Sequence, residues 1–224
     1  MEIIKNAVIA AAGVGSRLGH GIPKCMLEIG GKTLLTRLIT TLDDLANEII
    51  IVVGYRENLI IDHCKKHHPH VTIINNPAYL TTNTVQSMAL GSQGLSGKTI
   101  FMDGDLVIKP ESLYEFFKKS TKHTILAAIS PSQSEYPVHV NLECTNDHDN
   151  QFFIKSFTRE SGLPYEWANV VSGPPRMLDG ASGYVYEKLE EYTPICATPL
   201  DLCEIDTESD LAIAKEFVQN LDQN

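Results

Sequence analysis

The stretch Ala7-Val-Ile-Ala-Ala-Ala-Gly-Val-Gly-Ser-Arg-Leu-Gly-His-Gly-Ile-Pro-Lys24 decides how this chain folds. Its apolar opening predicts a buried strand. Three glycines follow at once, and glycine lets a backbone approach a phosphate closely and turn its N–H groups toward it. Arg17 and Lys24 add two cations at the same place. This order of strand, glycines, Arg and Pro-Lys predicts a phosphate-binding loop rather than an ordinary flexible turn.

Two better-known glycine loops do not fit the chain. The dinucleotide pattern G-x-G-x-x-G requires a glycine where Leu18 stands. The P-loop pattern G-x-x-x-x-G-K-[ST] fails at both Gly-Lys-Thr triplets, because Met26 replaces the upstream glycine before Gly31 and Ser92 replaces it before Gly97. Both triplets are therefore interpreted as turns that lead into the next element.

The loop is part of a longer signature. Residues Ala11 to Gly19, Pro23-Lys24 and Glu28 to Leu35 resemble the signature of nucleotidyltransferases, the enzymes that make nucleotide sugars and CDP-alcohols. The resemblance continues at Phe-Met-Asp-Gly-Asp, residues 101–105, and at Glu-Ile-Asp-Thr-Glu-Ser-Asp-Leu, residues 204–211. It covers sugar-1-phosphate nucleotidyltransferases and phosphocholine cytidylyltransferases alike, so it names neither the nucleotide nor the acceptor.

Composition limits the number of domains. The chain has 224 residues, of which 43% are hydrophobic, enough for one substantial core. We find no repeat, low-complexity tract or linker. We therefore predict a single nucleotidyltransferase domain over residues 1–224, with the nucleotide-binding part at about 1–130 and the acceptor-binding part at 131–224.

Charge and cysteine content limit the partners. The net charge is −10, and no basic run is longer than Lys65-Lys66 or Lys118-Lys119, which argues against nucleic acid. The sequence has no apolar segment of membrane-spanning length, and its start lacks a signal-peptide layout. Five cysteines without a C-x-x-C pair indicate reduced thiols. We expect a cytoplasmic protein that binds neither nucleic acid nor membranes, and leave a homo-oligomer open.

Predicted strands and helices alternate over the first 130 residues. The strands cover residues 7–12, 48–53, 71–75, 99–102 and 125–129, and the helices cover residues 33–45, 57–67, 85–90 and 111–119. Alternation predicts an α/β fold with a doubly wound, mostly parallel sheet, Rossmann-like as in the nucleotide-diphospho-sugar transferases that the signature resembles. Ligands bind at the carboxyl ends of such strands, where the glycine loop and Asp103-Gly-Asp105 both lie.

The pattern changes after residue 130. Apolar and polar residues alternate over 138–144, a turn follows at 146–150, and 151–158 returns, which predicts a β-hairpin that covers the active-site crevice. The rest is predicted as irregular over 161–175, helical over 182–192, a strand over 202–206 and a final helix that Thr207 caps.

The resemblance assigns roles to the loop and to the acidic residues. Lys24 and Arg17 are the expected catalytic cations, with Arg17 on the β- and γ-phosphates and Lys24 between the α-phosphate and the acceptor. Asp105 and Asp206 are the expected ligands of one Mg²⁺, a cation that prefers carboxylate oxygens. Either aspartate alone is as well explained by helix capping. The expected nucleotide contacts are Ala11, Ala12, Gly13, Val14, Gly15, Ser16, Arg17, Lys24, Asn83, Ser87 and Asp103.

The loop from Asn75 to Thr84 has two interpretations. It is a helix entry with Asn83 or Thr82 as N-cap, or, as the resemblance implies, it contacts the nucleobase through Asn83 and Ser87. In the second interpretation, Asn83 and Ser87 resemble the Asn and Ser of the bacterial phosphocholine and aminoethylphosphonate cytidylyltransferases. We therefore expect CTP before UTP.

The acceptor contacts are expected on the hairpin and just after it. Lys155 and Arg159 compete for the acceptor phosphate. Tyr136 and Trp167 would form an aromatic wall for an amine head group, although packing of the hairpin onto the sheet is the commoner role of any single aromatic residue.

The expected reaction joins an NTP to a small phosphorylated or phosphonylated acceptor and releases pyrophosphate. A sugar 1-phosphate is the alternative acceptor. Two other classes of protein fit part of the pattern: a glycosyltransferase that uses Asp103-Gly-Asp105 as a D-x-D motif, and a nucleotide-binding regulator. The first has no need of Arg17 and Pro23-Lys24, and the second need not keep both Asp105 and Asp206.

Overall fold

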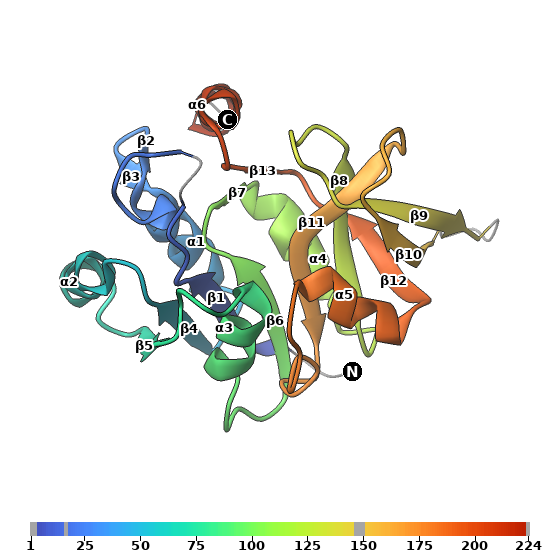
Figure 1. Cartoon of the computed structure of the whole chain (residues 1–224), viewed down its shortest axis with the longest axis horizontal. Helices are drawn as coiled ribbons and strands as arrows, with labels where there is room; N and C mark the ends of the chain where they lie inside the picture. Colours follow the sequence, from blue (N-terminus) through green and yellow to red (C-terminus); the bar gives the residue numbers. More distant parts are fainter. Residues whose placement is uncertain (1–3, 16–17, 146–150, 223–224) are drawn as a thin grey trace.

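A computed structural model describes residues 4–15, 18–145 and 151–222. One nine-stranded sheet with the order β5-β4-β1-β6-β11-β8-β12-β10-β9 runs through the molecule, with β5 at one side and β9 at the other (Figure 1). Its strands are β1 (Ile4–Ala11), β4 (Glu48–Val53), β5 (Thr72–Asn75), β6 (Lys98–Asp103), β8 (Leu126–Pro131), β9 (His139–Cys144), β10 (Phe152–Thr158), β11 (Tyr165–Gly173) and β12 (Ile195–Pro199).

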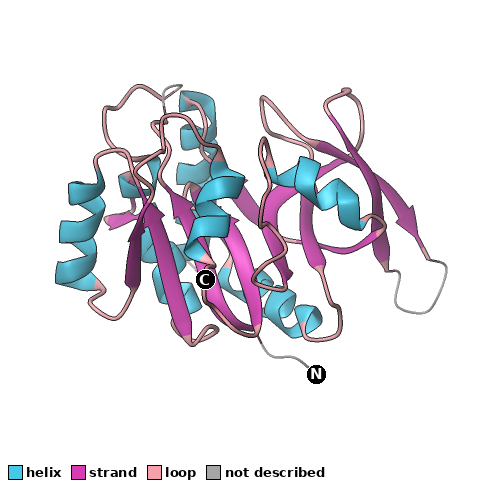
Figure 2. Cartoon of the chain, turned by 60° about the horizontal axis from the view of Figure 1, so that its bottom comes forward, coloured by secondary structure: helices cyan, strands magenta, loops and turns pink. Residues whose placement is uncertain are grey.

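The first part of the sheet is parallel. Strands β5, β4, β1 and β6 run in the same direction, with Ala7 of β1 opposite Ile49 of β4 and Ile100 of β6. Helices cover both faces of the strands (Figure 2). They are α1 (Leu34–Leu42), α2 (Glu57–His67), α3 (Thr84–Gly91) and α4 (Pro110–Ser120). The predicted α/β fold with a mostly parallel sheet is confirmed.

Successive residues of β1 face opposite cores, which explains its unbroken apolar run. Ile9 joins the core that α1, α2 and α4 build, whereas Val8 joins the core that contains Val85 and Met88 of α3. Burial of both faces requires apolar side chains at every position, as is typical of parallel strands between two helical layers. The glycine loop follows the end of this fixed strand.

The second part of the sheet is mixed. Strand β11 lies antiparallel between β6 and β8, and Glu166 also pairs with His139 of β9. The prediction of an irregular segment over 161–175 is therefore wrong. The strand pattern is hidden because the pairing register shifts between Trp167 and Val171, and Asn169 at this irregularity has a left-handed φ of 53°. A bulge breaks the period of two that sequence analysis depends on.

The predicted hairpin is present as β9 and β10, with Phe157 opposite Val140. The predicted turn at 146–150 lies outside the described residues. Strand β12, parallel to β8, was not anticipated. The predicted helix over 182–192 is two short pieces, α5 (Val185–Leu189) and the 3-10 helix η2 (Glu190–Tyr192).

Two small elements bring the end of the chain to the crevice. Strand β7 (Leu106–Ile108) pairs with β13 (Leu202–Glu204), so that the residues after β13 lie beside those before β7 (Figure 1). Helix α6 (Glu208–Asp222) then packs Leu211 and Val218 into a small core that includes Leu27. The remaining elements are η1 (Lys24–Met26), β2 (Glu28–Ile29) and β3 (Lys32–Thr33). Among the described helices, none has the length and apolar character needed to cross a membrane.

Candidate active site

A cavity of about 420 Å³ opens where the two parts of the sheet meet. One wall is formed by the end of β1, the glycine loop and the turn after β6, and the other by β11, the segment before β9 and the tyrosines of α5. The first wall includes Gly13 and Asp105, and the second includes Tyr136, Trp167 and Tyr184. The convergence at strand ends that the sequence predicts is therefore present.

The glycine loop lies against the Lys24 side chain. Gly15 has a left-handed φ of 62°, and a Cβ added there would lie 2.8 Å from Lys24 Cγ, so both the conformation and the space require glycine. The predicted nucleotide contacts Ala11, Ala12, Gly13, Val14 and Gly15 all line the cavity. Ser16 and Arg17 lie outside the described residues, so their roles stay predictions.

Lys24 is held between two aspartates from distant parts of the chain. Its Nζ donates hydrogen bonds to Asp105 Oδ2 at 3.0 Å and to Asp206 Oδ1. Burial lowers the pKa of Lys24, but the charges of Asp105 and Asp206 outweigh that effect, so the pKa lies above its ordinary value. A permanently charged ammonium therefore lies beside the glycine loop.

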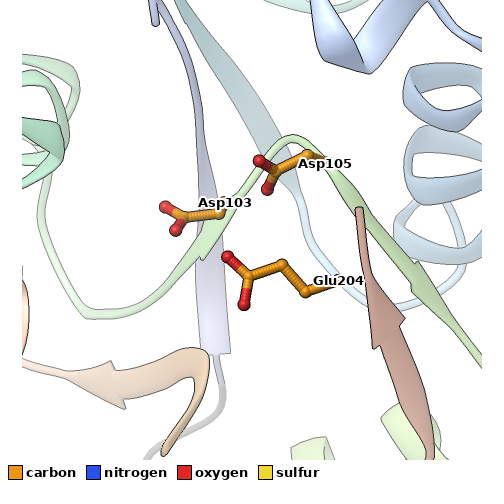
Figure 3. A group of neighbouring side chains, drawn as sticks. All are labelled: Asp103, Asp105 and Glu204. Carbon is orange, nitrogen blue, oxygen red and sulfur yellow. The ribbon is translucent and has the colours of Figure 1, made fainter. Parts of the chain in front are cut away.

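A cluster of carboxylates lies next to this lysine. Asp103, Asp105 and Glu204 each direct an oxygen toward the others, and these oxygens all lie within 4.8 Å of one another (Figure 3). Oδ1 of Asp103 and Oδ1 of Asp105 are buried, with no hydrogen-bond partner in the part of the chain that the structure describes. Burial and the charge of Asp105 raise the pKa of both Asp103 and Glu204.

These carboxylates fit a hard divalent cation. Buried oxygens without partners and mutual repulsion among like charges are both relieved by a bound cation. In this arrangement Asp103 and Asp105 would both be ligands of the cation. Asp103 is also a predicted nucleotide contact. Asp206 instead contacts Lys24. The predicted pairing of Asp105 and Asp206 on one Mg²⁺ stays a prediction, with Lys24 lying between the two carboxylates.

Sequence reasoning missed Glu204 and Asn169. Asn169, at the irregularity of β11, donates from Nδ2 to Glu204 Oε2 at 2.8 Å and so fixes the direction of that carboxylate. The sequence does contain a pattern that indicates Glu204, because Glu204-Ile-Asp206 repeats the acid-x-acid spacing of Asp103-Gly-Asp105. No such pattern indicates Asn169, since its conformation depends on a register shift between strands that are far apart in sequence.

The predicted base contacts lie at the entry of α3. Asn83 precedes the helix and its backbone N–H donates to Gln86 Oε1 at 2.7 Å, so the helix-entry interpretation is confirmed. Ser87 is buried and accepts a hydrogen bond from Asn76 Nδ2 at 3.0 Å. Both Asn83 and Ser87 also line the cavity, and their contact with a base stays a prediction.

The acceptor candidates separate into two groups. Lys155 is not among the cavity-lining residues, and its ammonium pairs with Glu143 at 2.7 Å across the hairpin. Its assignment to the acceptor phosphate stays a prediction, and the side chain lies on the exposed face of β10. Arg159, just beyond the end of β10, lines the cavity together with Tyr136 and Trp167.

Known proteins share parts of this sequence. The bifunctional protein GlmU of Prochlorococcus marinus is 31% identical over 134 residues, which are 57% of this chain and 30% of GlmU. The bifunctional IPC transferase and DIPP synthase of Rubrobacter xylanophilus is 38% identical over 87 residues, 38% of this chain and 20% of that protein. The 2-aminoethylphosphonate cytidylyltransferase of Lancefieldella rimae is 29% identical over 132 residues, 53% of each. The chain thus spans between a fifth and about half of these relatives.

Solved structures share the fold over the whole chain. The inositol-1-phosphate CTP transferase from T. maritima superimposes with a TM-score of 0.76 at 19% identity, covering 100% of this chain and 99% of that one. The CTP:phosphocholine cytidylyltransferase from Streptococcus pneumoniae gives 0.72 at 17% identity, covering 97% and 100%.

The match to a protein family covers more of the chain than the three pairwise alignments above. The description "MobA-like NTP transferase domain" fits residues 7–151 of the 224, a span that begins at the apolar strand and includes the glycine loop and the Asp103-Gly-Asp105 turn. The resemblance to nucleotidyltransferases is thereby confirmed, and the chain belongs to the family of MobA-like NTP transferase domains.

Proposed function

We propose that the protein transfers a nucleoside monophosphate from an NTP to a small phosphorylated or phosphonylated acceptor. The observation that carries this proposal is the charged Lys24, held by Asp105 and Asp206 beside a glycine loop and a carboxylate cluster. Cations and backbone N–H groups suit a polyphosphate, and the family supplies the reaction class.

The chemistry needs alignment and charge stabilisation more than a protein nucleophile. An oxygen of the acceptor phosphate attacks the α-phosphorus, a new P–O bond forms, and the bond from the α-phosphorus to the bridging oxygen breaks. Pyrophosphate leaves with the bonding electron pair. The Lys24 ammonium stabilises the charge that develops on the α-phosphate, and the loop residues Ala12 to Gly15 orient the triphosphate.

We further propose Mg²⁺ as the cofactor. Asp103, Asp105 and Glu204 would hold it, because their oxygens converge and two of these oxygens are buried with no hydrogen-bond partner among the described residues. When bound, Mg²⁺ neutralises phosphate charge and helps to orient the triphosphate. The protein's own part is to keep Lys24 charged and the three carboxylates together.

CTP is the proposed nucleotide, before UTP. Asn83 and Ser87 line the cavity, as a base-contacting loop should. Two similar proteins carry cytidylyl or CTP transfer in their names, the 2-aminoethylphosphonate cytidylyltransferase and the inositol-1-phosphate CTP transferase. The alternative is a sugar 1-phosphate with another NTP, which the resemblance of the signature to sugar-1-phosphate nucleotidyltransferases leaves open. We also propose that the enzyme works in the cytoplasm, on small molecules alone.

The test is a screen of the four NTPs against phosphocholine, 2-aminoethylphosphonate, myo-inositol 1-phosphate and glucose 1-phosphate. Pyrophosphate release is measured in the presence of Mg²⁺. We expect turnover with CTP and at least one acceptor. Consumption of a ready-made nucleotide sugar without pyrophosphate release would instead assign the chain to the glycosyltransferases and overturn the proposal.

A further inference from the structure

The aromatic wall at the acceptor end of the cavity already carries a cation of the protein itself. The rings of Tyr184 and Tyr186 are stacked, with centroids 5.7 Å apart and an interplanar angle of 14°. The Arg159 guanidinium lies over both, with Cζ at 5.7 Å from the Tyr184 centroid and 5.3 Å from the Tyr186 centroid. A cation–π contact of this kind uses the faces that an amine head group would need.

Arg159 is held in this place by the segment before β9, which belongs to the same wall. Its Nη1 donates to the carbonyl oxygen of Tyr136 at 2.8 Å and to that of Pro137 at 3.4 Å. The guanidinium thus links the segment before β9 to the tyrosines of α5. Trp167 is only 5% exposed and meets Phe157 edge to face. Tyr136 and Tyr184 are exposed and line the cavity, but Arg159 lies over the rings of Tyr184 and Tyr186 and would repel a second cation there.

A buried carboxylate lies at the same end. Glu166 of β11 is 4% exposed, and its Oε1 accepts hydrogen bonds from the backbone N–H groups of Gln133 and Ser134 and from the Ser134 hydroxyl. Its Oε2 is buried and has no partner among the described residues. Leaving a carboxylate oxygen buried without a hydrogen bond is costly, so this oxygen requires a donor from a ligand or a water molecule.

The space beside Glu166 limits what that donor is. Glu166 lines the main cavity and also a side cavity of about 20 Å³ that it shares with Asn169 and Glu204. About one water-sized group fits such a volume. A hydroxyl fits, whereas a trimethylammonium group does not.

The position of Glu166 also fits the rest of the site. It lies three positions before Asn169 on β11, and the Asn169 amide holds Glu204 of the carboxylate cluster. At about 3.3 Å per residue, this separation is at most roughly 10 Å. Glu166 therefore lies near the carboxylate cluster, and it shares the side cavity with Glu204 of that cluster.

Resting on the proposed function, we infer that the acceptor is a polyol phosphate and that Glu166 determines this specificity by accepting a hydrogen bond from one of its hydroxyl groups. Hydroxyls suit both charged side chains, since they donate to Glu166 and add no cation near Arg159. Quaternary amines offer no hydrogen to Glu166, and at the faces of Tyr184 and Tyr186 they would meet the Arg159 cation.

The experiment compares acceptors that differ at the head group, using the NTP that the screen identifies. The probes are myo-inositol 1-phosphate, phosphoethanolamine and phosphocholine. We expect the polyol to have a kcat/KM at least about tenfold above that of either amine, as one hydrogen bond to a charged group implies. The two amines carry the same charge, but the nitrogen bears hydrogens in phosphoethanolamine and methyl groups in phosphocholine, so their comparison tests the N–H donors at constant charge.

The variant is Glu166→Gln, in which the amide oxygen is able to keep the three bonds that Oε1 accepts while an NH₂ group replaces Oε2. We expect the KM for the polyol phosphate to rise at least about tenfold, with the KM for the NTP changed less than about twofold. Ser134→Ala is the matched comparison, because it removes one bond to Oε1 and leaves Oε2. It should leave the ratio of polyol to phosphocholine turnover unchanged, and thermal unfolding checks that both variants are folded.

The outcomes distinguish the two proposals. Efficient turnover of phosphocholine or phosphoethanolamine, or an unchanged polyol KM in Glu166→Gln, would overturn the inference and leave nucleotidyl transfer standing. In the second case Oε2 binds only water. Equal rises in both KM values would show a structural role for Glu166 and overturn the inference as well. No pyrophosphate release by the unaltered protein with any pair would overturn the proposed function, and the inference with it.

Discussion

The two ends of the cavity are built in different ways. The nucleotide end is formed where parallel strands stop, and its charges are dense: Lys24 contacts Asp105 and Asp206, and Asp103 and Glu204 lie beside them. The acceptor end is formed by an antiparallel strand, a hairpin and a short helix. Its charged groups have separate partners. Arg159 lies over two tyrosine rings, and Glu166 accepts a hydrogen bond from the loop residue Ser134.

This difference separates chemistry from selectivity. Charges that converge on a phosphate act most strongly in the transition state, so changes at the nucleotide end should lower kcat/KM for every acceptor. Arg159 and Glu166 at the acceptor end lie apart, so each would interact with a different part of the acceptor. Changes there should alter the ranking of acceptors, as proposed for Glu166, and leave the chemistry in place.

The largest effect is expected from Lys24→Ala. Removing the ammonium leaves Asp105 and Asp206 unneutralised and removes a charge used in the transition state. We expect kcat/KM to fall at least about a hundredfold, roughly 3 kcal/mol, with every acceptor. Lys118→Ala, which alters an exposed ion pair with Glu115 on α4, is the control and should change kcat/KM less than about twofold. Near-normal turnover of Lys24→Ala would remove Lys24 from the mechanism.

The next effect concerns the metal. Activity should require Mg²⁺, and Asp105→Asn or Glu204→Gln should weaken metal affinity by about tenfold or more, because an amide is a poorer ligand for a hard cation. Asp206→Asn tests the predicted sharing of Mg²⁺ with Asp105. Binding of Mn²⁺ followed by electron paramagnetic resonance gives a readout that is independent of turnover. Full activity in excess EDTA would contradict the expectation.

A smaller effect is expected from Asn169→Ala, which leaves the carboxylates in place and removes the hydrogen bond that orients Glu204. Loss of such an outer contact weakens metal affinity by about tenfold in typical sites. Asn169 also has a left-handed φ, so Asn169→Gly, which suits that conformation, separates backbone strain from the lost amide. If both variants bind Mn²⁺ normally, the amide does not position Glu204.

The smallest effect is expected at the acceptor end. Arg159→Met removes the guanidinium from the faces of Tyr184 and Tyr186 while keeping an extended side chain. We expect the kcat/KM of phosphocholine relative to myo-inositol 1-phosphate to rise by about threefold to tenfold, since a cation–π contact is worth about 1 kcal/mol. An unchanged ratio would show that Arg159 does not exclude amines from the tyrosines.

The contrast between the two ends of the cavity also explains which features could be predicted from the sequence. The strand, the glycine loop and Lys24 are contiguous, so local pattern was enough to place them. Asp105 and Asp206 required the family signature, because β7 and β13 pair across about a hundred residues. Two features had no local signal: β11, whose period is broken at Asn169, and the choice between Lys155 and Arg159.

That last choice depended on where β10 ends. Lys155 lies inside the strand on its exposed face, whereas Arg159 follows the final residue, Thr158, and turns into the cavity. The two residues are only four positions apart, and the bounds of an element are the part of a sequence-based prediction that is least reliable.

Strand β11 also has a consequence for how the chain reaches its native state. It is the only antiparallel partner that β6 has in the described sheet, and it pairs with β8 on its other side and with β9 at Glu166. Closing these pairings requires residues from 99 to 173, so neither half can complete its sheet before the chain is nearly whole. A fragment that ends at residue 130 would leave an unpaired edge on β6, the kind of edge that recruits other chains and aggregates.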